Sequence, residues 1–449
     1  MRGRCRTARG PRGGAWSALS STAVRLGAVA VLLGATAAVG PGAAAAATEA
    51  SGTPAPYAFT DGARSIEGAR STAEAPPLEP GTAYRSSLPS RGKVSYSLRL
   101  DATSNAYVSV TAVPSPGSTV SVIDGLKVSV QDAQGNSCSD DTVSFGAARS
   151  PHPIAAWGRR EISPTKPLCR SAGAYYVTVE RADPEGEGSS PDAWDLELLA
   201  MTEPRTAKAA ATGAPGAWNS ATPQPLQGGT ERRRGGAGFT GATPLDQGVW
   251  RDYIRPGQTL FYAVPADWGQ QLAVTADLGS IPSGGTGYTP GALDLALYNP
   301  ARGHTAGVSV GYDGEQASGS LPPLPPVDHA NRNAAVAQVS AMRFAGSYYL
   351  VAHLADSVAD TFGDGPFAMT LRVRVSGEPR GGPGYAGESV PEGAFEVSDQ
   401  DREAAAEGVP VTGGDTAMRV LAVGGIGTGS ALLVGLGVWT VLARRRGVA

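Results

Sequence analysis

The chain has 449 residues, enough for two or three domains of about 150 residues each, and it contains 61 glycines and 35 prolines. Only 17% of its residues are charged, which excludes a long coiled coil and favours a turn-rich β protein, since coiled coils are rich in charged residues and leucine. Segment 46–443 holds 40 acidic and 28 basic residues, so we expect no nucleic-acid partner, because a net negative surface repels nucleic acid.

The N-terminal segment 1–47 has the features of a secretory signal peptide. Arginines precede an apolar run at 26–39, a Gly-Pro-Gly break follows at 40–42, and alanines occupy 43–47. A basic region, an apolar region of this length and a small-residue cleavage site together direct a chain to export. We therefore expect the segment to be removed, leaving a linker at 48–65 as the start of the exported chain.

Strand patterns dominate the middle of the chain, and they occur in the same order twice. Within each strand apolar residues alternate with polar ones, which is typical of a sheet with one buried face. Pro77–Gly81 matches Pro244–Gly248, and Ala172–Tyr176 matches Ala345–Tyr349, at a nearly constant offset. Self-similarity at this scale indicates a tandem duplication of a whole domain.

The duplication predicts an all-β fold with two tandem, jelly-roll-like β-sandwich modules, at 66–203 and 236–377. Each unit is large enough to bury its own core. The segment between them, 204–235, is rich in Ala, Gly, Pro and Thr, and we expect a flexible linker. Segment 378–419 is rich in Gly and Pro and then acidic, and we expect a disordered stalk.

The second module resembles the bacterial pre-peptidase C-terminal module, a small β-sandwich appended to many secreted hydrolases. The resemblance is carried by Leu293–Pro300, Ala345–Leu350 and Gly365–Leu371. It covers most of residues 250–375 and extends weakly to the first module. It implies a β-sandwich fold, but family members usually accompany a catalytic domain, which is not evident in this sequence.

Two cysteines remain once the signal peptide, with Cys5, is removed. They are Cys138 and Cys169. An even number of cysteines in an oxidising compartment favours a disulfide, whereas a redox or metal role would need further ligands. We therefore predict a structural bridge between Cys138 and Cys169 that stabilises the fold by about 3–4 kcal/mol.

A second apolar run, at 420–443, lies near the C-terminus and ends at three arginines. With a rise of about 1.5 Å per residue, this run is long enough to cross a hydrocarbon core of about 30 Å. The arginines place the tail, 444–449, in the cytoplasm. We therefore predict a single-pass protein of the cell membrane, with a transmembrane helix at 420–443 and its N-terminus outside.

The five residues Val409, Pro410, Val411, Thr412 and Gly413 stand shortly before this helix. They resemble the Leu-Pro-x-Thr-Gly sorting signal of Gram-positive cell-wall proteins, which also precedes an apolar helix and a short basic tail. The resemblance implies cleavage after Thr412 by a sortase and attachment to the cell wall. We favour retention in the membrane instead, because valine fills an apolar recognition pocket less well than leucine.

One motif suggests a serine hydrolase. Ser309 lies in a G-x-S-x-G sequence, followed by Asp328 and His353. That motif requires a sharp turn from a strand into a helix, and no helix is expected after Ser309. The four histidines are not at metal-ligand spacing; they are His152, His304, His329 and His353. We therefore expect no enzyme and no zinc.

A calcium ion is a weak candidate cofactor. Asp356, Asp360 and Asp364 fall within one loop, and calcium takes six to eight oxygen ligands, as a rule from such loops. Solvated carboxylates in a turn are the commoner interpretation, so no cofactor is firmly expected.

Three aromatic residues are candidates for a sugar-binding platform. They are Trp250, Tyr253 and Trp268, near one end of the second module. Such residues in alternating strands belong more often to the core, which leaves the platform an open alternative.

The sequence as a whole predicts an exported, membrane-tethered and non-catalytic protein of the bacterial cell surface. Its tandem sandwiches would serve recognition or structure, with a cell-wall polymer or an envelope protein as partner. One alternative is an accessory subunit of an envelope complex, and a more distant one is a secreted serine hydrolase that uses Ser309.

Overall fold

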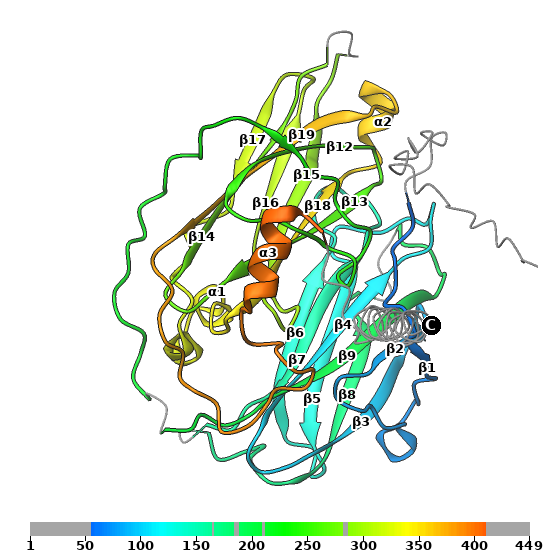
Figure 1. The fold of residues 1–449 in the computed structure, drawn as a ribbon. Helices are drawn as coiled ribbons and strands as arrows, with labels where there is room; N and C mark the ends of the chain where they lie inside the picture. The colour runs from blue at the N-terminus through cyan, green and yellow to red at the C-terminus, as the bar shows by residue number, and fades with distance from the viewer. Residues whose placement is uncertain (1–54, 164–165, 184–187, 209–211, 282–285, 410–449) are drawn as a thin grey trace, which may run out of the picture. The chain divides into compact units, whose positions relative to one another are not determined.

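The computed structural model (Figure 1) describes residues 55–163, 166–183, 188–208, 212–281 and 286–409. The predicted signal peptide, transmembrane helix and cytoplasmic tail lie outside these ranges, as do residues 410–413 of the sorting motif, whereas Val409 is described and exposed. Among the described residues, every helix is too short or too polar to span a membrane.

The first sandwich consists of two sheets, which we call sheets I and II. Sheet I contains, in spatial order, β1 (Arg64–Ser65), β2 (Ala83–Leu88), β9 (Trp194–Glu203), β4 (Asn105–Val113) and β7 (Ile154–Arg160). Sheet II contains β3 (Lys93–Leu100), β8 (Gly173–Arg181), β5 (Gly125–Asp132) and β6 (Ser137–Ser144). The pairs are antiparallel except at the edge, where β1 runs parallel to β2. A 3-10 helix, η1 (Thr72–Glu74), connects β1 to β2.

The second sandwich consists of sheets III and IV. Sheet III contains β10 (Glu231–Arg232), β12 (Gly248–Ile254), β19 (Phe367–Ser376), β14 (Gln271–Leu278) and β17 (Ala317–Ser320). Sheet IV contains β11 (Thr243–Pro244), β13 (Thr259–Ala266), β18 (Gly346–Leu354), β15 (Thr289–Tyr298) and β16 (His304–Tyr312). Its helices are η2 (His329–Asn333), α1 (Ala337–Ala341) and α2 (Val358–Phe362), and α3 (Asp399–Glu407) follows in the C-terminal segment.

The strand orders of the two sandwiches correspond except for the edge strand β11, which sheet II lacks, and this agreement confirms the tandem β-sandwich fold predicted from the repeat. A buried tyrosine also makes an equivalent hydrogen bond in each sandwich. The hydroxyl of Tyr96 in β3 donates to Ser86 of β2 at 2.7 Å, and that of Tyr262 in β13 donates to Asp252 of β12 at 2.8 Å. Each bond links one sheet of a sandwich to the other.

Each sandwich has its own core, formed by the inward-facing residue of every second strand position. In β15, for example, Leu293, Leu295 and Leu297 are all 0% exposed. The expectation of a single buried face fails for β4, however, where every residue from Asn105 to Ala112 is buried. The second face of β4 is covered by the other sandwich.

An apolar interface joins the outer face of sheet I to sheet IV and its connecting loops. Tyr107 of β4 stacks on Trp157 of β7, with ring centroids 5.6 Å apart, and meets Phe344 of the second sandwich edge to face at 5.0 Å. A second cluster packs Ala155 of β7 against Phe261 of β13 and its neighbours. The aromatic contacts therefore pack part of the outer face of sheet I against the second sandwich.

Buried ion pairs cross the same interface. Arg302 donates to Glu197 of β9 at 2.6 Å, and both side chains are almost fully buried. Arg332 of η2 donates to Glu203, also in β9, at 2.7 Å. A charge buried without its partner is strongly destabilising, so these pairs make the relative position of the two sandwiches specific.

The segment expected to be a free stalk packs onto both sandwiches as far as Val409. Val390 and Thr202 of β9 exchange backbone hydrogen bonds, and Phe395 is 0% exposed between Tyr107 and Phe344. Helix α3, orange in Figure 1, begins with a capping box at Ser398 and contacts β11 and β13. The acidic composition of this segment predicted disorder. The segment is ordered as far as Val409 because a buried aromatic ring and a well-capped helix hold it against the sandwiches.

The segment between the sandwiches, expected to be a flexible linker, is also held at several points. Arg233 donates to the carbonyl of Ala406 at 2.7 Å and lies 4.8 Å from the ring centre of Trp250. Arg372 of β19 donates to the carbonyl of Leu226 at 2.9 Å. The linker and the C-terminal segment therefore contact one another as well as sheet III.

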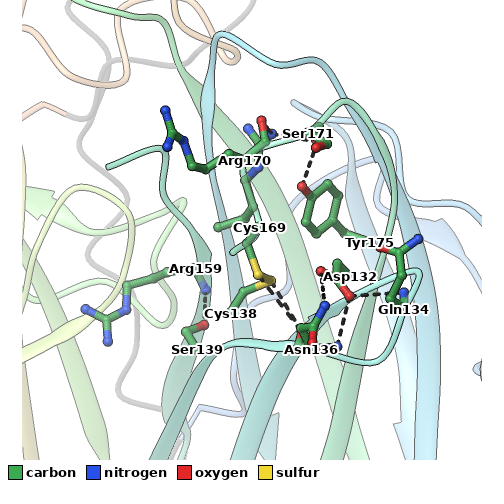
Figure 2. Close-up of a disulfide and its surroundings, with 11 residues drawn as sticks. Asp132, Gln134, Asn136, Cys138, Ser139, Arg159, Cys169, Arg170, Ser171 and Tyr175 are labelled. Carbon is green, nitrogen blue, oxygen red and sulfur yellow. Dashed lines mark hydrogen bonds between the residues drawn. A yellow bond between two sulfur atoms is a disulfide. The ribbon is translucent and has the colours of Figure 1, made fainter. Parts of the chain in front are cut away.

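The predicted disulfide between Cys138 and Cys169 is present (Figure 2). It connects the start of β6 to the loop before β8, with the Cα atoms 5.7 Å apart. The hydroxyl of Tyr175 in β8 donates to the carbonyl of Ser171 in this loop at 2.7 Å. The bridge therefore fixes a long connection at one end of sheet II.

Replacing Cys138 by serine is expected to lower the free energy of unfolding by about 3 kcal/mol, because the closed loop restricts the unfolded chain. Thermal unfolding of the variant and the wild type measures the loss. In the non-reduced wild type, both cysteines should resist alkylation. Two thiols that react freely without denaturant would contradict the bridge.

Candidate functional site

Three of the four histidines, far apart in the sequence, surround a small cavity of about 110 Å³ where the sandwiches meet. His152, in the loop before β7, stacks on His353 of β18 with ring centroids 4.3 Å apart. His304 and Asp294 also line the cavity. Residue spacing does not indicate this cluster, because its members come from different modules and only strand register places Asp294 beside His353.

Hydrogen bonds fix the ring of His353. Its Nε2 lies 2.8 Å from the hydroxyl oxygen of Ser150, which also accepts the backbone N–H of Asp356 at 3.0 Å. Its Nδ1 lies 3.0 Å from the hydroxyl oxygen of Thr259. Since Ser150 already accepts from Asp356, its hydroxyl is free to donate to Nε2, and a neutral imidazole suits this arrangement.

Burial favours the neutral forms of these groups. It lowers the pKa of His353 well below its ordinary value, with the stacked His152 as a further cause. It likewise lowers the pKa of His152 and raises that of Asp294. Across the described part of the chain, no group of three or more His, Cys, Asp or Glu side chains is arranged to hold a metal ion. The stacked rings of His152 and His353 form a contact between the two sandwiches.

Acidification from pH 7.5 to pH 5 is expected to destabilise the protein. Unfolded histidines have a pKa of about 6.5, whereas folded His353 binds its proton only at much lower pH, and burial, with Arg332 next, lowers the pKa of His329 to about 4. The stability is therefore complete above about pH 6.5 and falls below it, by at most about 1.4 kcal/mol per pH unit for each such histidine. The raised pKa of Asp294 has the opposite effect, because the folded state binds this proton more readily than the unfolded state and so gains stability as the pH falls.

Denaturant unfolding at the two pH values measures this dependence. The variant His353→Gln keeps a hydrogen-bonding side chain that does not titrate, and it should lose stability less steeply on acidification than the wild type. If the free energy of unfolding falls equally with pH in the two proteins, His353 does not contribute to the pH dependence of stability.

The residues of the hydrolase motif do not form a triad. Ser309 lies within β16, which leads to β17 through a turn, so the strand-to-helix elbow is missing. Asp328 caps η2 by accepting the backbone N–H of Ala330 at 2.8 Å. His353 bonds instead to Ser150, whose side chain is 0% exposed and therefore closed to a substrate.

The candidate calcium ligands are spread over a short helix and its flanks. Asp356 accepts the N–H of Ser357, Asp360 lies within α2, and Asp364 precedes β19. No metal-binding arrangement of carboxylates forms in the ranges that the structure describes.

The candidate sugar platform is not formed by its three aromatic residues. Trp250 and Trp268 are 5% and 9% exposed and belong to the core of the second sandwich. Tyr253 alone is well exposed, at 45%. A platform needs open ring faces, so the two tryptophans act as core residues, as alternating strands usually dictate.

A cleft of about 1080 Å³ opens at the junction of the two sandwiches. Residues of both contribute, including the aromatic rings of Phe59 and Phe261 and several prolines on neighbouring loops. The guanidinium of Arg85 lies 3.9 Å from the ring centre of Phe59, which holds it at the mouth of the cleft. Apolar walls with a few charged groups are typical of ligand-binding clefts.

A second depression, of about 990 Å³, lies on the first sandwich, and we call it the basic groove. Its four basic side chains are all exposed; they are Arg70, Arg85, Arg91 and Lys93. Arg85 and Asp195 line both depressions. The groove and the junction cleft are therefore neighbouring depressions, which sequence patterns did not indicate.

These features define an all-β protein of two fused β-sandwiches. No protein-family model matches the chain, and a comparison with curated proteins finds no match. Among solved structures, the chain is similar to the pre-peptidase C-terminal domain of a collagenase from Bacillus anthracis, with 17% identity over 28% of this chain and 94% of that one, and a TM-score of 0.18.

Two tandem-domain structures are also similar. Tandem CBM22 domains from Paenibacillus barcinonensis share 7% identity over 65% of this chain and 84% of that one, with a TM-score of 0.17. Tandem CBM51 modules of a family 98 glycoside hydrolase from Streptococcus pneumoniae share 7% identity over 66% and 84%, with a TM-score of 0.17. These scores are too low to support an argument about function, so the fold assignment rests on the strand pairing.

Proposed function

We propose that this chain is an exported, membrane-tethered protein of a bacterial cell surface that binds an envelope component without catalysing a reaction. The observation that carries the proposal is the pair of neighbouring depressions, the basic groove and the junction cleft, which share Arg85 and Asp195. Two sandwiches joined by buried ion pairs hold such depressions in a preorganised form, which suits binding because a preorganised surface loses little entropy on association.

The proposed lack of catalysis is supported by the positions of the candidate nucleophiles. Ser309 lies on a strand, and Ser150, which does contact a histidine, is buried. The resemblance of the second module to pre-peptidase C-terminal modules agrees with an accessory, non-catalytic role. A serine hydrolase would need a nucleophile open to its substrate and bonded to its base.

The proposed location follows from the terminal segments of the sequence. Segment 1–47 directs export, and 420–443 remains as a transmembrane helix with the sandwiches outside. The alternative is sortase cleavage after Thr412 and attachment to the cell wall. The helix needs no second anchor, because insertion of such a segment is effectively irreversible.

Cell fractionation tests the tether. Detergent is expected to release the whole protein, whereas enzymes that digest the cell wall should release none, and Thr412→Ala should change neither result. Release by wall digestion alone, abolished by Thr412→Ala, would show that the protein is a sortase product.

A pull-down tests the binding role. The full-length chain, solubilised in detergent and immobilised, is expected to retain polymer fragments from digested cell walls. Retention of envelope proteins in place of polymers would favour an accessory subunit, and retention of neither would refute the proposal.

A further inference from the structure

The basic groove collects positive charge from both sheets of the first sandwich. Arg85 belongs to β2 of sheet I, and Lys93 begins β3 of sheet II. Arg91 lies in the turn between these strands, and Arg70 lies between β1 and η1. The fold thus brings together, at one open edge of the sandwich, four cations from three separate parts of its chain.

Most of this charge is not neutralised. Within the described residues, no carboxylate forms an ion pair with Arg70, Arg91 or Lys93, and Arg85 approaches Asp195 only to 3.9 Å, with both side chains more than half exposed. Glu67 and Asp195 are the acidic residues of the lining, so the groove keeps a net charge of +2. Segment 46–443 as a whole is strongly acidic, with 40 acidic and 28 basic residues, which makes this local excess of cations distinctive.

The other polar residues of the groove suit an oxyanion. Ser65, Ser86 and Ser87 line it alongside the cations. The hydroxyl of Ser86 accepts from Tyr96 at 2.7 Å, so its own proton is available to a ligand. Hydroxyl donors beside guanidinium groups are typical of sites that bind phosphate or carboxylate, since hydrogen bonds to a charged acceptor are the stronger ones.

We infer that the basic groove binds a segment of an anionic polymer, with repeating phosphate or carboxylate groups. A volume of about 990 Å³ is far larger than a single small anion requires, and Arg85 also lines the neighbouring junction cleft. A flat anionic membrane suits this site less well, because the cations line a concavity in an otherwise acidic protein. This assignment rests on the proposed binding role and specifies its ligand.

Titration of the full-length, detergent-solubilised chain with fluorescent long-chain polyphosphate tests the site, with polygalacturonate as a carboxylate polymer and dextran as a neutral one. Both anionic polymers should bind, with affinity falling as salt rises, and dextran should not. Lys93→Glu should weaken binding at least threefold, and the double variant Arg91→Glu/Lys93→Glu at least tenfold.

Arg99→Glu provides the matched control. Arg99 lies exposed in the same strand, β3, six residues further on and about 20 Å away. It should weaken binding less than twofold, and all variants should keep the wild-type melting temperature. Arginines 444–446 give a constant background that every variant shares.

Equal losses for Lys93→Glu and Arg99→Glu would overturn the groove as a site, because the attraction would then be diffuse. Displacement of polyphosphate by micelles doped with phosphatidylglycerol would identify a membrane as the ligand and also overturn the inference. If groove variants bind both anionic polymers as the wild type does while cell-wall fragments are still retained, the groove assignment fails and the binding role stands. If cell-wall fragments are not retained, the titration still reports on the groove independently.

Discussion

Replacing Glu203 by alanine is expected to lower the free energy of unfolding by about 3–5 kcal/mol, because it leaves a buried arginine without its counter-charge. Glu203 is 0% exposed and accepts hydrogen bonds from Asn105 and Tyr107, both at 2.8 Å. It also accepts from Arg332 of the second sandwich at 2.7 Å and from Tyr385 of the C-terminal segment at 2.9 Å. One carboxylate thus connects three parts of the chain.

The charge of Glu203 is maintained by its partners. Burial raises the pKa of this carboxyl, but Arg332 and the other hydrogen-bond donors outweigh burial and lower the pKa to about 2. A group with a lowered pKa stabilises the folded state above its unfolded pKa of about 4.3 and loses that contribution as the pH falls toward 2. At neutral pH the full contribution is present.

Denaturant unfolding of Glu203→Ala measures the loss, and Glu79→Ala serves as the control. Glu79 pairs with Arg64 at 2.7 Å, but both side chains are more than 60% exposed, so this change should cost less than about 1 kcal/mol. A Glu203→Ala variant as stable as Glu79→Ala would mean that the buried network does not hold the sandwiches together.

Replacing Phe395 by alanine is also expected to cost about 3–5 kcal/mol, because the change leaves a cavity at the junction. The ring of Phe395 stacks on Phe344 with centroids 4.7 Å apart and meets Tyr107 edge to face at 5.9 Å. These neighbours belong to different sandwiches, so the cavity cannot close by the movement of a single strand.

Thermal unfolding and limited proteolysis together measure the effect of Phe395→Ala. The variant should melt at a lower temperature, and proteases should cut it earlier than the wild type within residues 378–394. Tyr288→Ala is the control, because Tyr288 is 67% exposed and its loss should change stability by less than about 0.5 kcal/mol. An unchanged cutting rate in Phe395→Ala would show that this ring does not secure the segment.

The fold within each sandwich was predictable from the sequence because strand alternation and the repeat are local signals. The interface between the sandwiches was not predictable. The sequence of β4 alternates like that of a strand with one solvated face, yet Ser109 and Thr111 on that face are buried because the second sandwich packs there. A closer signal was present in Tyr107 and Trp157, which place large aromatic rings on that supposedly solvated face. Phe395 was missed because a single aromatic residue hardly changes the composition of an acidic segment.

The candidate sites can likewise be divided into those that a local sequence signal indicates and those that it does not. The disulfide was predictable from the number and compartment of the cysteines. The histidine cluster and the basic groove depend on strand register and on which sheet edges meet, and neither is encoded in residue spacing. Conversely, the three aspartates near α2 are close in the sequence, but no metal-binding group of His, Cys, Asp or Glu side chains forms in the described ranges.

The docked C-terminal segment determines how the molecule would respond to mechanical load. If the chain is anchored beyond Val409, a pull from the anchor first reaches α3, where Arg402 bonds to Asp267 at 2.8 Å. Further tension reaches Phe395 and then the short backbone bridge between Val390 and Thr202. These contacts would break one after another before either sandwich unfolds. The segment between the anchor and the binding surface would therefore lengthen under force while both sandwiches keep their sheets.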